Sequence, residues 1–121
     1  MWSDEESRIL AECWMRATLN PDIGNSQSHS SFWGTVRQDY NSKVREQRRM
    51  DQISDKWTKM ANDIMLFVAL YERLVNHWLS GANDNDIMVS VKKAFREQQK
   101  KVFVYEDAWR VVRECPPISS V

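Results

Sequence analysis

Apolar residues recur every three or four positions through most of this chain, which is the spacing of one face of an α-helix. The clearest run lies between residues 51 and 80, where the spacings alternate between four and three: Ile53, Trp57, Met60, Ile64, Phe67, Tyr71, Leu74 and Trp78. A helix with such a heptad stripe either forms a dimeric coiled coil with a second chain or is the central helix of an intramolecular bundle. We favour the bundle, because bulky aromatic side chains are poor knobs in a coiled coil.

Two shorter helices are predicted before this long helix and two after it. The first covers residues 3–19, where Ser3 and Glu6 have the spacing of a capping box. The second covers residues 31–45, the fourth starts near residue 83 and the fifth spans 105–115. With only three Gly and three Pro in 121 residues, the chain favours helices over a turn-rich β protein. The sequence therefore predicts an all-α protein.

The predicted helices divide into a core and an extension. Residues 2–80 are expected to form a three-helix core with a long third helix. Residues 81–115 are expected to form a helical extension packed on that third helix, and residues 116–121 a tail. Indole side chains are large enough for a few of them to fill a small core. We expect this role for all six tryptophans: Trp2, Trp14, Trp33, Trp57, Trp78 and Trp109.

The net charge is zero, with 17 basic and 17 acidic residues, but the charges are segregated along the chain. Residues 35–62 and residues 92–121 each hold seven basic and four acidic residues, and the two remaining blocks are acidic. The basic blocks form either one basic face or an ordinary solvated surface. The second basic block, from Lys92 to Lys101, has two possible partners, flanking DNA or the acidic groups of a protein.

Few residues suggest catalysis or metal binding. The glycines at positions 24, 34 and 81 stand alone, so they form no phosphate-binding loop. The pairs Cys13 and Cys115, and His29 and His77, lack the spacing of a zinc site. The two thiols are either buried and inert or, in an oxidising compartment, disulfide partners. We therefore expect no enzyme, no catalytic residue, no metal, no cofactor, no small-molecule substrate and no membrane span.

A family resemblance rests on the spaced tryptophans. The segment Trp2-Ser3-Asp4-Glu5-Glu6, followed by Trp33 and Trp57, resembles the Myb/SANT helical domain. Residues 20–24, with Gln27 and Phe32-Trp33, are similar to plant-type Myb/SANT-like domains, which are related to trihelix factors and to accessory proteins of Harbinger-type transposons. Residues 80–84, Phe103 and residues 108–110 continue the pattern, so the resemblance covers residues 2–113.

This resemblance implies a helix-turn-helix-like fold whose third helix enters the major groove of double-stranded DNA. It implies a nuclear DNA-binding module of a transcription regulator or transposon-derived protein. The residues implied in DNA contact are Lys43, Arg45, Arg48, Arg49, Gln52, Lys56, Lys59 and Asn62. Asp51 and Asp55 depart from this pattern, because a carboxylate repels phosphate. The alternative is a protein-interaction module in a nuclear or chromatin-associated complex, with a nuclear protein as its partner.

Overall fold

The computed structural model describes residues 2–20, 29–77 and 83–113. Within these ranges the chain forms helices and no strand, so the predicted all-α class is confirmed. The helices are α1 (Asp4–Leu19), α3 (His29–Asn41), α4 (Met50–His77), α5 (Asp84–Gln99) and α6 (Glu106–Val112). The predicted division of the chain near residue 80 stays a prediction.

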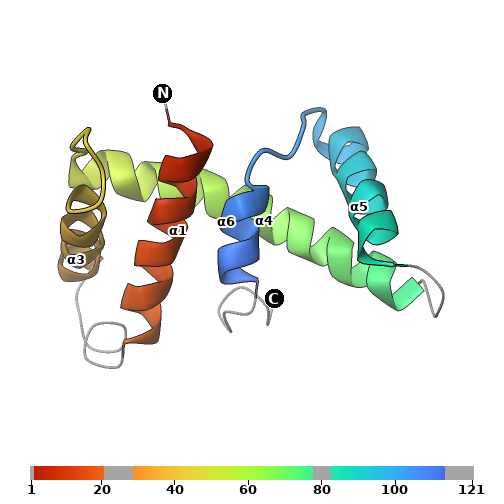
Figure 1. The fold of residues 1–121 in the computed structure, drawn as a ribbon, viewed down its shortest axis with the longest axis horizontal. Coiled ribbons are helices and arrows are strands. Elements are labelled where there is room, and N and C mark those ends of the chain that lie inside the picture. The colour runs from red at the N-terminus through yellow and green to blue at the C-terminus, as the bar shows by residue number, and fades with distance from the viewer. Residues whose placement is uncertain (1, 21–28, 78–82, 114–121) are drawn as a thin grey trace.

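Helix α4 is the axis on which the other described helices are arranged. Its 28 residues span about 42 Å at 1.5 Å per residue. Helices α3, α1, α6 and α5 lie in that order along α4 and cross it (Figure 1). Helix α6 packs beside α1, and α5 packs on α4. The first and the last described helices are therefore neighbours in the middle of the row.

The start of α1 is fixed by the predicted capping box, which the structure confirms. The Glu6 backbone N–H donates to Ser3 Oγ at 3.1 Å, and the Ser3 backbone N–H donates to Glu6 Oε1 at 2.9 Å. Asp4 and Glu5 also lie in the first turn, where negative charge interacts favourably with the helix dipole. This reciprocal cap satisfies two backbone donors that would otherwise lack partners at the helix terminus.

The apolar stripe of α4 forms the centre of the core. Its buried members are Ile53, Trp57, Met60, Ile64 and Phe67. The Phe67 ring stacks on Phe103 at a centroid distance of 4.0 Å and meets the Trp109 ring edge-on at 5.1 Å. Aromatic pairs in these geometries add stability beyond the area that they bury. The second half of α4 is thus covered by α6 and by the segment that leads into it.

The described tryptophans differ in burial. Trp33, Trp57 and Trp109 are buried in the core. Trp2 and Trp14 are partly buried and pack against it, and Trp14 stacks on Trp57 at 4.5 Å. Trp78 lies outside the described residues.

The second predicted helix ends earlier than expected. The sequence pattern extended it to Arg45, but α3 ends at Asn41. The Lys43 backbone N–H donates to the Tyr40 carbonyl at 2.9 Å, so the chain turns after the helix. The apolar side chain of Val44 had been assigned to a continuing helix, and it lies instead in the non-helical connection.

Candidate functional site: a polar pocket beside α3

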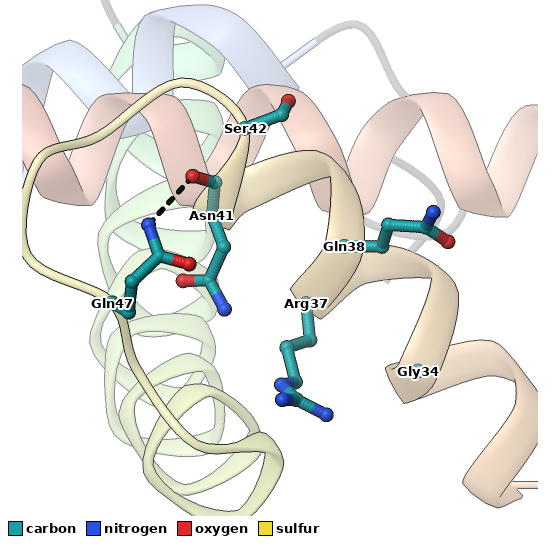
Figure 2. A pocket seen from close by; sticks show the side chains of 6 residues that line it. All are labelled: Gly34, Arg37, Gln38, Asn41, Ser42 and Gln47. Carbon is teal, nitrogen blue, oxygen red and sulfur yellow. Dashed lines mark hydrogen bonds between the residues drawn. The ribbon is translucent and has the colours of Figure 1, made fainter.

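Helix α3 is amphipathic, and its polar face forms one wall of a pocket. Trp33, Val36 and Tyr40 are buried against the core. Residues three or four apart share one side of a helix. The residues on the other face are Gly34, Arg37, Gln38 and Asn41. The segment 42–49, which follows α3, forms the opposing wall (Figure 2).

The pocket has a volume of about 480 Å³, within the range of roughly 300–1,000 Å³ that is usual for small-molecule sites. Its lining is polar: Gly34, Arg37, Gln38, Asn41, Ser42 and Gln47. Figure 2 shows the Arg37 and Asn41 side chains extending from the same side of α3, while Gln47 faces Asn41 from the other wall. The pocket therefore offers amides, a hydroxyl group and one guanidinium.

Asn41 fixes the distance between the two walls. Its Nδ2 donates to the Arg48 carbonyl at 3.0 Å, and its Oδ1 accepts from the Arg48 backbone N–H at 2.9 Å. Gln47 Nε2 donates to the Asn41 carbonyl at 2.9 Å (Figure 2). The Asn41 side-chain amide thus forms hydrogen bonds with both the N–H and the carbonyl of Arg48, and these bonds hold segment 42–49 against the end of α3.

Arg37 supplies the positive charge of the pocket. Its side chain is exposed, and within the described ranges no carboxylate pairs with it. A guanidinium carries five N–H donors and binds carboxylates in a bidentate manner. The space beside Gly34 is open, because a Cβ atom built there meets no other atom within 4 Å. The pocket can therefore accept an anionic ligand that also carries amide groups.

Arg48, in segment 42–49, is the buried centre of an ionic cluster. The Arg48 side chain is 9% exposed, and its Nη2 lies 3.4 Å from Glu6 Oε2. The guanidinium also lies 4.3 Å from the centroid of the Trp2 ring, a cation–π geometry. Arg48 Nε is buried and finds no hydrogen-bond acceptor in the part of the chain described. Arg48 therefore ties α1 to this segment.

Two groups beside Arg48 have shifted pKa values. The hydrogen bond from the Ser3 backbone N–H is the main reason that the pKa of Glu6 lies below its ordinary value. Burial, followed by the charge of Glu6, raises the pKa of Tyr40 to about 12. Tyr40 therefore stays protonated at neutral pH, and its hydroxyl group lies 3.3 Å from Glu6 Oε2 as a hydrogen-bond donor.

Several residues that the sequence implied in DNA contact have partners within the protein. Arg48 was expected to be exposed and is buried, because Glu6 and Trp2 cover its guanidinium. Lys43 pairs with Asp39, and Arg49 Nε pairs with Asp51 Oδ1 at 3.0 Å. These three cations thus have partners within the chain.

Lys56 and Gln52, which the sequence also implied in DNA contact, have partners within the protein as well. Lys56 Nζ donates to the Tyr105 hydroxyl at 3.1 Å and lies over the Tyr105 ring. Gln52 Oε1 accepts from the Arg49 backbone N–H at 2.9 Å, so its side chain caps the start of α4. Six of the implied residues are exposed: Lys43, Arg45, Arg49, Gln52, Lys59 and Asn62. Of these, Arg45, Lys59 and Asn62 make no side-chain hydrogen bond or ion pair with the described residues.

Cysteine and metal chemistry receive no support from the described residues. Cys13 is buried and free, and burial raises the pKa of its thiol to about 12. Cys115 lies outside the described residues. Among residues 2–20, 29–77 and 83–113, no group of His, Cys, Asp and Glu side chains could hold a metal ion. In the same ranges no helix is both long and apolar enough to cross a membrane.

Comparison with known proteins identifies two similar plant proteins from Arabidopsis thaliana. Glutathione S-transferase T3 is 24% identical to this chain over 116 residues, and glutathione S-transferase T2 is 21% identical over 119 residues. Each alignment covers 93% of this chain but only 20% of the relative, so the chain spans about a fifth of the length of these proteins. No family model matches the chain, and no solved structure matches it.

These relatives correct several expectations from the sequence. The resemblance to Myb/SANT-like domains is contradicted, because both relatives are named glutathione S-transferases. The assignment as a DNA-binding module is contradicted for the same reason, and so is its alternative, a nuclear protein-interaction module. The expectations of no enzyme and no small-molecule substrate are also contradicted, since a transferase is an enzyme that acts on glutathione. The nuclear localisation stays a prediction.

Sequence reasoning missed the pocket, although part of its signal was present. The polar positions at 34, 37, 38 and 41 recur at helical spacing, opposite the predicted apolar face of the same helix. This stripe identifies one wall. The second wall depends on the hydrogen bonds between Asn41 and Arg48, which no periodic pattern encodes.

Proposed function

We propose that this chain has a glutathione S-transferase-like role, in which the pocket beside α3 binds glutathione. The proposal rests on the guanidinium of Arg37, which no carboxylate of the described residues pairs with and which lies in an amide-lined pocket. The identity of the ligand is inferred from the names of the two similar plant proteins. Glutathione is a tripeptide with two carboxylates, two amides, an amino group and a thiol, so it needs a cation and several hydrogen-bonding partners.

The lining has free hydrogen-bonding capacity for such a ligand. Arg37 can pair with one carboxylate through two parallel N–H bonds. Gln47 uses its Nε2 within the protein, at 2.9 Å from the Asn41 carbonyl, so its Oε1 remains to accept from a ligand N–H. The Gln38 side chain is exposed on the same helix and offers both a donor and an acceptor.

The proposal assigns binding to this pocket and assigns no proton-transfer residue. The lining consists of one glycine, one arginine, three amides and one serine, so it includes no histidine, cysteine or carboxylate that could take a proton from the ligand. A thiol reacts as its thiolate, and a nearby cation favours that form. Because Arg37 is assigned to a ligand carboxylate, the pocket supplies binding alone, and the thiol of bound glutathione loses its proton to solvent.

Calorimetric titration of the chain with reduced glutathione tests the proposal. We expect saturable binding and about fivefold weaker binding for Arg37→Ala, because an exposed ion pair contributes up to about 1 kcal/mol. Arg73→Ala is the matched control, because Arg73 is also an exposed arginine on a helix but lies outside the pocket. The proposal is wrong if no binding occurs at about 10 mM ligand, or if both variants bind as the wild type does.

A further inference from the structure

The outward face of α5 carries a stripe of three cations and one apolar residue. Ile87, Met88, Val91 and Phe95 are the buried side of this helix. On the opposite side lie Val89, Lys93 and Arg96, at spacings of four and three residues, and Lys100 is the C-cap residue directly after the helix; we call these four residues the α5 stripe. Residues at these spacings lie one above the other on a helix. All four are exposed, and Val89 is 61% exposed.

The cations of the α5 stripe differ in ion pairing from the neighbouring basic residues Lys92 and Lys101. Lys92 pairs with Glu106, and Lys101 Nζ lies 3.0 Å from Asp63 Oδ2. Within the part of the chain that the structure describes, Lys93, Arg96 and Lys100 make no ion pair. The stripe therefore presents three cations that form no ion pair with a carboxylate of the described residues.

Lys100 is also held in an unusual backbone conformation. It caps the end of α5 with φ 60° and ψ 28°, the left-handed region, and it is the non-glycine residue of the described chain with positive φ. Glycine is the usual residue at such a cap, because a Cβ atom makes this conformation unfavourable. A lysine here adds a third exposed cation directly after the helix that carries Lys93 and Arg96, at a cost in backbone energy. Such an outlier is a reason to look for a function.

From these observations we infer that the α5 stripe is a docking surface for an acidic segment of another protein. Carboxylates of the segment pair with the three cations, and an apolar side chain packs on Val89. The exposed carboxylates Asp86 and Glu97 border the stripe. They repel a uniformly negative polymer or membrane surface, whereas a peptide can place its carboxylates selectively.

The probe is a fluorescently labelled peptide that carries one leucine followed by three glutamates at helical spacing. Its binding is measured by fluorescence anisotropy. We expect wild-type protein to bind it with an affinity that falls as salt rises. Replacing two cations by glutamate, as Lys93→Glu with Arg96→Glu, should weaken binding about tenfold. The control Lys59→Glu reverses an exposed cation of α4 and should leave the affinity unchanged.

Lys100→Gly separates the docking role from folding. Glycine accepts the left-handed conformation, so the variant should melt at the wild-type temperature or above it, yet bind the peptide about threefold more weakly. Equal binding by wild type and the Lys93 and Arg96 double variant would overturn the inference. So would the absence of peptide binding, or tighter binding to a DNA duplex or to phosphatidylserine vesicles than to the peptide.

Discussion

Replacing Asn41 by alanine is the sharpest test of how the pocket is built. The Asn41 amide makes two hydrogen bonds to the backbone of Arg48, at 2.9 and 3.0 Å, in a partly buried position. Alanine removes both bonds and leaves the N–H and the carbonyl of Arg48 without these partners. Each such bond contributes about 1 kcal/mol, so we expect Asn41→Ala to lower the free energy of unfolding by about 2 kcal/mol.

Urea denaturation followed by tryptophan fluorescence measures this loss. With a denaturant slope of 1–3 kcal/mol/M, the unfolding midpoint should fall by roughly 1 M. The matched control is Gln38→Ala, because Gln38 lines the same pocket and its exposed side chain makes none of the hydrogen bonds that hold segment 42–49. The control should stay within about 0.2 M of the wild type. If Asn41→Ala also stays within that margin, the two walls of the pocket are not joined as described.

Three other changes have defined outcomes. Gly34→Ala should raise thermal stability by about 1 kcal/mol, because a methyl group there meets nothing within 4 Å and alanine favours the helix; a lower melting temperature would contradict this. In a Cys115→Ser background, Cys13 should react with a thiol reagent at pH 8 only as the protein unfolds, since its pKa is raised to about 12; rapid labelling of folded protein would count against its burial. The Ser3 backbone N–H lowers the pKa of Glu6 from 4.5, so the stabilisation from Glu6 is fully present above pH 4.5 and is lost as pH falls through the lowered value. Glu6→Gln should therefore flatten the loss of stability below pH 4.5, and an unchanged acid profile would refute the assignment.

The elements with local signals could be predicted from the sequence. The stripe from Ile53 to Phe67 is buried as the heptad spacing indicated, because residues three and four apart share a helix face in any fold. The capping box of Ser3 and Glu6 likewise depends on four consecutive residues. Local periodicity was thus sufficient for the presence of the helices and for the buried side of α4, although it placed the end of α3 at Arg45 instead of Asn41.

The features with distant partners could not be predicted. Arg48 follows a run of basic residues and resembles an exposed cation, yet its charge is paired with Glu6, 42 residues earlier in the chain. Nothing in the sequence indicates that α6 packs beside α1. The resemblance based on spaced tryptophans failed for a related reason: large aromatic residues at helix starts serve packing, and packing does not specify the ligand.

Amide chemical-shift mapping by NMR, with reduced glutathione titrated into the isotopically labelled chain, tests the central claim most directly. The account predicts saturable shifts concentrated on the six pocket residues, from Gly34 to Gln47, with α5 unaffected. It predicts that Arg37→Ala moves the titration to higher glutathione concentration without shifting the signals of the core. Shifts spread over other helices, or no shifts at all, would contradict the claim that this pocket binds glutathione.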